Sequence, residues 1–330
     1  MSRPFAPRVR VSSYLSDWMP SGDTTRQSVA GYLGGGSDGS TNLSGIDKIT
    51  FSNDSKSTLS ATLTTARQAL TGVADSGVAG YFVAGNDGAV LSGIDKIAFP
   101  ADTKTTLSAT ASTAHRLSAG FADSGVAGYY GGGDNAGATQ YSFIDKLAFP
   151  AETRSTMTTT LTSARKLHSG FGNNGVAGYF CGGNASDVRQ NNIQKISFTS
   201  DSSTTLAATL TVRTAHGTFA DNGVAGYICG GVANAPDGSG GNFTSIDKIA
   251  LPADTKTTLS ATLTNAANSL SGFANSGLAG YACGGQNATG TTFFDNIDKI
   301  ALPADTKTTL AATLTSNVLS AAGFSNQGVF

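Results

Sequence analysis

Charged residues are scarce in this 330-residue chain. Asp, Glu, Lys and Arg together make up 13% of the sequence, and the formal net charge is −1 at pH 7. A surface with so little charge of one sign creates no field that would gather nucleic acid or an anionic membrane. We therefore expect neither nucleic acid nor a membrane surface among the partners of this protein.

Long apolar runs and helical periodicity are missing as well. No window approaches the roughly 20 apolar residues that a transmembrane helix needs, and the stretch after Met1 lacks the apolar core of a signal peptide. No segment of ten or more residues repeats apolar side chains at the spacing of a helix face. These absences predict an all-β protein without membrane insertion and without a Sec signal.

Cysteine is rare, and its three copies share one setting. Each stands just before a Gly-Gly pair, at a position where similar stretches of the chain carry Gly or Val. A position that accepts Gly, Val and Cys is a small packed slot, so we expect free thiols rather than a disulfide or a metal site. The three residues are Cys181, Cys229 and Cys283.

What the chain has in abundance is repetition. The phrase Ala-Gly-Tyr-x-x-Gly-Gly, or a close variant, occurs six times, and each copy is followed by Ile-Asp-Lys-Ile or a close variant. A period near fifty residues with several short strand-like runs is typical of a β-propeller. The Tyr residues that mark the copies are Tyr32, Tyr81, Tyr129, Tyr179, Tyr227 and Tyr281.

One copy shows the expected strands. We predict strands at residues 166–173, 176–181, 193–198 and 204–210, and Asn173-Asn174-Gly175 is typical of a tight hairpin turn. Four antiparallel strands in each of six copies predict a six-bladed propeller over residues 29–330.

The ends of the repeat array are out of phase. The first copy starts at its second strand, whereas the chain finishes with an extra innermost strand within residues 318–330. We predict that this C-terminal strand pairs with residues 29–34 and completes blade one, which hides two strand edges.

The repeats resemble kelch repeats, since a Gly-Gly pair ends a short aromatic strand and an Arg precedes the innermost strand in four copies. They differ in having Thr-Thr-Leu where kelch repeats usually carry Trp. Their amino-acid sequence, including Pro-Ala-Asp-Thr-Lys-Thr-Thr-Leu, also resembles that of repeat proteins of tailed bacteriophages, cyanophages among them. The resemblance implies a kelch-like propeller in a phage virion, at the tail or particle surface, made in the host cytoplasm.

The loops after the Gly-Gly pairs differ most between copies. They hold Asn, Asp, Ser and Gly together with aromatic residues, and in a kelch-like blade they share a face with the loops before the innermost strands. Variable loops on a rigid scaffold often bind ligands. The alternative is drift of unselected loops. The candidate binding stretches are 86–93, 134–143, 184–192, 232–245 and 286–296, with Tyr141, Phe243, Phe293 and Phe294 as candidate contacts.

The loops before the innermost strands add positive charge in four of the copies. Because Arg grips a carboxylate with two nitrogens, this pattern favours an acidic sugar as ligand. The alternative is that the arginines hold backbone carbonyls between blades, a role implied by the kelch resemblance. The candidate residues are Arg67, Arg116, Arg165, Arg213, His115, His168 and His216.

No arrangement of residues indicates catalysis. The histidines lie on separate copies without an acid specific to that copy, and the Asp of Ile-Asp-Lys recurs in five copies, which favours a structural hydrogen bond or ion pair. We expect no enzymatic activity, no cofactor and no metal site, although loops such as Asp134-Asn135 leave Ca²⁺ open.

Residues 1–28 match no repeat and contain the only Trp of the chain. Trp and Arg are frequent at binding hot spots, so Arg8, Arg10 and Trp18 suit an attachment arm that docks on other virion proteins. The alternative is a strap that packs over the propeller.

Together these features predict a phage tail-appendage adhesin that binds a host-surface glycan. Two alternatives remain open: a purely structural or decoration protein of a virion or surface that docks through residues 1–28, and a cellular lectin or protein-interaction propeller.

Overall fold

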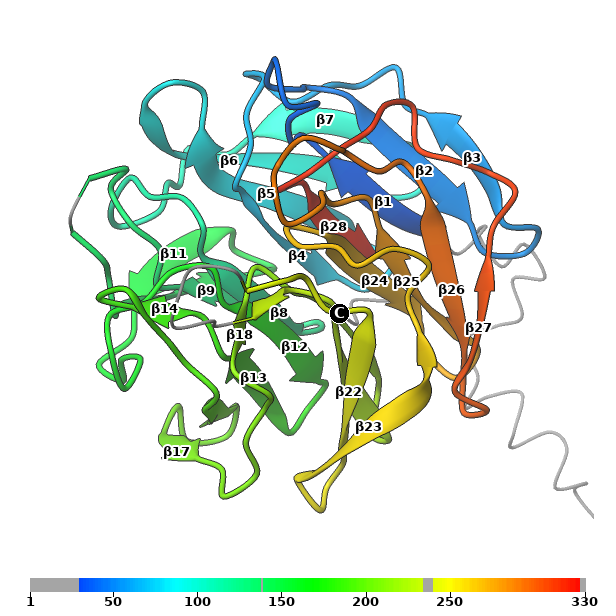
Figure 1. Ribbon diagram of the computed structural model, residues 1–330. Helices are drawn as coiled ribbons and strands as arrows, with labels where there is room; N and C mark the ends of the chain where they lie inside the picture. The colour runs from blue at the N-terminus through cyan, green and yellow to red at the C-terminus, as the bar shows by residue number, and fades with distance from the viewer. Residues whose placement is uncertain (1–29, 138, 234–239, 327–330) are drawn as a thin grey trace, which may run out of the picture.

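Six four-stranded antiparallel sheets are arranged in a ring (Figure 1). Their innermost strands line a central channel. The computed structural model describes residues 30–137, 139–233 and 240–326, and within these residues it contains 28 strands and no helix. The described part of the chain therefore offers no helix that would cross a bilayer. The predicted six-bladed β-propeller is confirmed.

Each blade runs from an innermost strand at the channel to an outermost strand at the rim. In that order, blade 1 is β28 (Ala322–Ser325), β1 (Ala30–Gly34), β2 (Ile46–Thr50) and β3 (Ser55–Thr58). Blade 2 is β4 (Thr71–Asp75), β5 (Ala79–Asn86), β6 (Val90–Ala98) and β7 (Thr103–Thr106). Blade 3 is β8 (Ala119–Asp123), β9 (Ala127–Gly131), β10 (Ile144–Ala148) and β11 (Thr153–Thr156).

The other three blades repeat this order. Blade 4 is β12 (Ser169–Asn173), β13 (Ala177–Cys181), β16 (Ile193–Ser197) and β17 (Ser203–Thr205). Blade 5 is β19 (Gly217–Asp221), β20 (Ala225–Cys229), β22 (Ser245–Ala250) and β23 (Thr255–Thr262). Blade 6 is β24 (Ser271–Asn275), β25 (Ala279–Cys283), β26 (Ile297–Ala301) and β27 (Thr306–Thr309). Four short strands lie outside the blades: β14 (Asn184–Ala185), β15 (Val188–Arg189), β18 (Arg213–Thr214) and β21 (Val232–Ala233).

The ring closes as the sequence predicts. Strand β28 pairs antiparallel with β1, with Tyr32 opposite Phe324 and Gly34 opposite Ala322. The two strands lie side by side in blade 1 although they come from opposite ends of the chain (Figure 1). Residues 1–29 and 327–330, including Arg8, Arg10 and Trp18, lie outside the described residues.

The Gly of each Ala-Gly-Tyr phrase makes room for a side chain of the preceding blade. In blade 4, a Cβ added to Gly178 would lie 1.9 Å from Cε2 of Phe121, which is fully buried on the innermost strand of blade 3. The same relation joins Gly31 to Phe273, Gly80 to Phe324, Gly226 to Phe171 and Gly280 to Phe219, while Gly128 faces Val73. The repeated Gly therefore sets how closely neighbouring blades pack.

We expect the substitution Gly178→Ala to destabilise the protein, because the added methyl group has no free space beside Phe121. Overpacking of this kind typically costs about 1–3 kcal/mol of the free energy of unfolding. Gly45→Ala is the matched control, since nothing lies within 4 Å of a Cβ at Gly45. Chemical denaturation of the two variants tests this, and equal stability of Gly178→Ala and the wild type would contradict the packing argument.

A second interblade contact explains the Tyr and Lys of the two phrases. In blade 4, the Tyr179 hydroxyl donates to one carboxylate oxygen of Asp254 at 2.9 Å, and Lys195 Nζ donates to the other at 2.7 Å. Asp254 belongs to a turn of blade 5. Burial, and then the hydrogen bond to Asp254, raise the pKa of Tyr179 well above its usual value, so the phenol stays protonated. Equivalent acceptors stand in every blade: Asp54, Asp102, Glu152, Asp201 and Asp305.

The Asp of the Ile-Asp-Lys phrase is structural. Asp298 is 1% exposed and accepts hydrogen bonds from the Thr264 backbone N–H at 2.8 Å and from the Thr309 hydroxyl at 2.8 Å. The first bond reaches the segment that leaves blade 5, so it ties neighbouring blades together. This is the role that the recurrence of the Asp in five repeats favours.

Candidate ligand-binding face

The variable loops and the segments before the innermost strands share one face, as expected. In blade 4 the two meet at Lys166 and Asn184, whose backbones exchange hydrogen bonds of 3.0 and 2.8 Å. Equivalent bridges join Gln68 to Asn86 and Asn268 to Gln286. We call the surface formed by these loops and segments the loop face.

Three of the four candidate arginines lie beneath this face. Arg67, Arg165 and Arg213 are 0–3% exposed, and each donates to a backbone carbonyl within the second strand of the blade that follows or directly after it. Arg213 also forms an ion pair with Asp247 at 3.0 Å. These side chains hold the connecting segments in place, so we revise the expected contact with a ligand: burial leaves none of the three guanidinium groups open to one.

Burial lowers the pKa of these arginines without removing their charge at neutral pH. It lowers the pKa of Arg165 to about 10, and Arg165 still carries its charge at neutral pH. Arg165 donates to Asn192 Oδ1 at 2.6 Å as well as to the Gly182 carbonyl, so its charge is met by oxygen acceptors inside the fold.

Arg116 is different because it reaches the surface. Its side chain is 30% exposed, and its Nε donates to Oδ1 of Asp134 at 2.9 Å. Lys166, from the next segment round the ring, donates to Oδ2 of the same carboxylate at 2.7 Å. Among the described residues, the two terminal nitrogens of Arg116 make no hydrogen bond. Two cations thus meet over one carboxylate that is itself fully buried.

The ionisation of Asp134 follows from these contacts. Burial by itself disfavours the charged carboxylate, but the hydrogen bonds from Lys166 and Arg116 outweigh it and lower the pKa of Asp134. With Asp134 ionised and both cations charged, the cluster carries a net charge of +1. We call Arg116, Asp134 and Lys166 the cationic cluster.

The sequence does point to this cluster, but only when equivalent positions of the six repeats are compared. Arg116 and Lys166 are equivalent residues in two neighbouring repeats. Asp134 stands at a second repeat position, whose backbone pairs with the first. Copies elsewhere fill these two positions with uncharged residues, for example Gln68 facing Asn86 and Asn268 facing Gln286. Charge therefore appears in this ring of paired positions only where blades 3 and 4 meet.

Amide groups surround the cationic cluster. Gln140 Nε2 donates to Asn184 Oδ1 at 3.4 Å, and Gln140 Oε1 accepts from the Ser186 backbone N–H at 3.0 Å. Tyr141 follows in the chain, is half-buried, and has its ring 5.6 Å from that of Phe143. This part of the loop face therefore combines cations, amides and an aromatic ring.

The other candidate aromatic residues have structural contacts. The Phe243 ring lies 4.6 Å from the guanidinium carbon of Arg213, and Phe293 packs against Gly39 in the loop of blade 1. Phe294 is partly buried against the core between blades 5 and 6. Only Tyr141 of the four candidates lies next to the cationic cluster.

The three histidines are buried. His115 is fully buried, and His168 and His216 are 6% and 5% exposed. His168 packs against Gly132 of the preceding blade, and His216 packs against Gly182 in the same way. Burial, with a smaller contribution from nearby arginines, lowers the pKa of His216 to about 3 and that of His168 well below its usual value. These imidazoles are therefore neutral and almost without exposed surface, and only His168 and His216 are among the residues that line the central channel.

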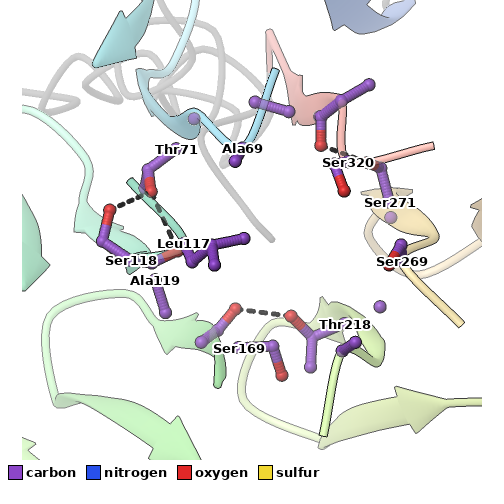
Figure 2. Close-up of a pocket in the computed structure, with 18 of the residues that line it drawn as sticks. Ala69, Thr71, Leu117, Ser118, Ala119, Ser169, Thr218, Ser269, Ser271 and Ser320 are labelled. Carbon is purple, nitrogen blue, oxygen red and sulfur yellow. Dashed lines mark hydrogen bonds between the residues drawn. The ribbon is translucent and has the colours of Figure 1, made fainter. Parts of the chain in front are cut away.

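The central channel is uncharged. Its cavity has a volume of about 140 Å³ and is lined by the starts of the six innermost strands (Figure 2). Thr71, Ser269 and Ser320 are among the residues that line the channel, and none of its lining residues is Asp, Glu, Lys or Arg. At its mouth on the loop face, six residues donate backbone hydrogen bonds of 2.6–3.0 Å head to tail round the ring: Ala69, Leu117, Leu167, Ala215, Ser269 and Ser320.

The cysteines are free and buried, as expected from their repeat position. Burial raises the pKa of Cys181 to about 12, so the thiol is protonated and a poor nucleophile at neutral pH. Within the part of the chain that the structure describes, no three His, Cys, Asp or Glu side chains gather in a way that would hold a metal ion.

Comparison with known proteins identifies the fold alone. No protein-family model and no curated protein sequence matches this chain. Among solved structures, that of YjhT is similar, with a TM-score of 0.66 and 14% sequence identity over 84% of this chain and 96% of the YjhT chain. At this level of identity the likeness shows a shared propeller fold.

Proposed function

We propose that this protein is a non-enzymatic adhesin of a phage tail appendage that binds an acidic host-surface glycan through its loop face. The observation that carries the proposal is the cationic cluster. Arg116 keeps two guanidinium nitrogens free for a carboxylate, and Lys166 lies on the other side of Asp134. A planar guanidinium matches the two oxygens of a carboxylate, which gives both affinity and orientation.

The surroundings of the cationic cluster also suit a sugar. The amides of Gln140 and Asn184 offer donors and acceptors for hydroxyl groups, and Tyr141 offers a half-buried ring. A binding role fits the chemistry of the reactive groups better than catalysis does, because the histidines are neutral and enclosed and the Cys181 thiol is protonated. The kelch-like kinship, the phage setting and docking on other virion proteins rest on the sequence resemblance.

The proposal predicts specific binding to acidic glycans that depends on Arg116. The variant Arg116→Gln/Asp134→Asn gives blade 3 the Gln and Asn pair that blade 2 has at Gln68 and Asn86, so we expect it to fold normally. Losing one charge-assisted contact of about 1.5–3 kcal/mol should weaken binding about 10-fold or more. A glycan array followed by titration of the best ligand measures this.

The matched control is Arg154→Gln, an exposed Arg on the outer strand β11, away from the loop face. We expect it to bind like the wild type. Binding that is equal in the wild type, the double variant and the control would place the site elsewhere. No binding by folded wild-type protein to any acidic glycan would overturn the adhesin proposal and favour the purely structural role.

A further inference from the structure

The face opposite the loop face carries a ring of exposed aliphatic side chains. We call this surface the turn face, because it is built from the hairpin turns between the first two and the last two strands of each blade. Six large hydrophobic side chains are exposed among the described residues, and five of them stand at one repeat position on this face: Val78, Val126, Val176, Val224 and Leu278. They are 45–64% exposed. We call these five residues the aliphatic ring.

The surroundings of the aliphatic ring are uncharged or have their charge paired, and Ser and Asn side chains link the hairpin turns, as where the Ser124 backbone N–H donates to Asn174 Oδ1 at 2.6 Å. Exposed Pro-Ala pairs lie in the neighbouring turns, as at Pro100-Ala101 and Pro252-Ala253. The acidic residues of those turns are engaged by lysines, for example Asp254 by Lys195 at 2.7 Å. Large aliphatic side chains that gather on one face of a folded protein commonly mark a place where another segment docks.

The chain itself supplies a segment at this face. The Ala30 backbone N–H donates to Asn326 Oδ1 at 3.0 Å, so β1 begins next to the end of β28, at the turn face. Val29 fills, in the sequence, the sixth copy of the position that the aliphatic ring occupies. The 29 residues before Ala30 are therefore connected to the fold at the edge of the aliphatic ring. For this reason we favour them, rather than a separate partner protein, as the segment that docks on the ring.

We infer that the stretch Tyr14–Met19 docks on the aliphatic ring, with Trp18 as its anchor. It contains Tyr14, Leu15, Trp18 and Met19, and Trp18 is the only Trp of the chain. The 12 residues from 18 to 29 span up to about 40 Å when extended, whereas the ring lies on the two inner strands of each blade, where neighbouring strands are about 4.8 Å apart. Tethering also keeps the segment at a high effective concentration, on the millimolar scale for short linkers.

This inference is independent of the glycan proposal. It assigns the strap role to Tyr14–Met19 and leaves Arg8 and Arg10 for a partner protein. Glycan binding involves the loop face, so either proposal can fail without the other.

Because Trp18 is the only Trp, its fluorescence reports its surroundings directly in the full-length protein. We expect the emission maximum of the native protein to lie at a clearly shorter wavelength than in urea, and its quenching by acrylamide to be several-fold weaker. Emission and quenching equal to those of the unfolded protein would overturn the inference.

The variant Val126→Ser/Val176→Ser/Val224→Ser tests whether the aliphatic ring is the docking surface. These side chains are about half exposed, so we expect the fold to survive, which circular dichroism checks. Trp18 emission should shift to that of the unfolded protein. Val188→Ser is the matched control, since Val188 is 61% exposed but lies in the loop face, and it should leave the emission unchanged.

Two further results would overturn the inference. One is Trp18 emission that stays blue-shifted in the triple Ser variant. The other is protection of Trp18 that disappears on dilution, which would make a second copy of the chain the occupant.

Discussion

Removing residues 318–330 is expected to abolish cooperative folding. The truncation deletes β28, so blade 1 loses its innermost strand, and Phe324 leaves the contacts that it makes with the rings of Tyr32, Phe82 and Phe99. Loss of a fully buried Phe alone costs about 3–5 kcal/mol, against a total stability of about 5–15 kcal/mol for most proteins. Thermal unfolding followed by circular dichroism measures the outcome.

The truncation also opens the backbone ring at the channel mouth. Ser320 accepts from Ala69 and donates to Ser269 in that ring, both at 2.8 Å, and the unpaired edge of β1 becomes free to aggregate. Phe324→Leu is the graded control: it keeps the strand and most of the apolar volume, so we expect a cooperative transition at lower temperature. A truncated protein that unfolded cooperatively at the wild-type temperature would refute closure by β28.

Acid is expected to destabilise the protein through His168 and His216. Both are enclosed and neutral in the fold, with pKa values lowered by burial and then by nearby arginines, whereas an unfolded His has a pKa of about 6.5. Above about pH 6.5 both states are neutral and the histidines have no effect. As the pH falls from there towards the folded pKa of about 3, the unfolded state binds protons first, so stability is lost.

The expected size follows from the pKa of His216. At about pH 4.5, the gap between that pH and the unfolded pKa is about 2 units, which corresponds to a loss of about 3 kcal/mol from this residue alone. The variant His168→Leu/His216→Leu removes both titrating groups and places at each position the residue that blades 2 and 6 carry, at Leu70 and Leu270. We expect near wild-type stability at neutral pH and greater stability than the wild type in acid.

Denaturant unfolding at several pH values measures both proteins. The carboxylates titrate equally in the two, so the difference between them isolates the histidines. If the wild type and the double Leu variant lost stability in parallel between about pH 6.5 and about 4, the histidines would not be the cause.

The fold could be predicted from the sequence because every repeat carries the same residues at its strands and turns. The short strand-like runs and the Asn173-Asn174-Gly175 type of turn are local features, and they return with the period of the Tyr residues. The missing strand of the first copy requires closure from the C-terminus. Prediction of the loop face succeeded for the same reason, since antiparallel strands fix which turns share an end of the blade. The strand limits differed in detail: β12 begins at Ser169 rather than at Lys166.

The candidate site was harder, because exposure depends on contacts between segments distant in sequence. Arg67, Arg165 and Arg213 share one repeat position, whereas Arg116 stands one position later, at the repeat position of Lys166. Arg116 reaches the surface, where its Nε engages Asp134 of the facing loop, whereas Arg213 turns inward to Asp247. The histidines looked like ligand contacts, yet His168 and His216 replace the core leucines Leu70 and Leu270, and His115 is fully buried at the repeat position of Arg67.

The sequence by itself thus determined six blades, four strands in each, the closing strand and the common face of the variable loops, because each follows from local pattern and repeat phase. Only the tertiary structure decided which repeated residues face a neighbouring blade and which face water. Val78 and its equivalents show the difference. Val176 was predicted to begin the strand 176–181, but the hairpin turn holds it and its equivalents on the turn face, where no described segment covers them.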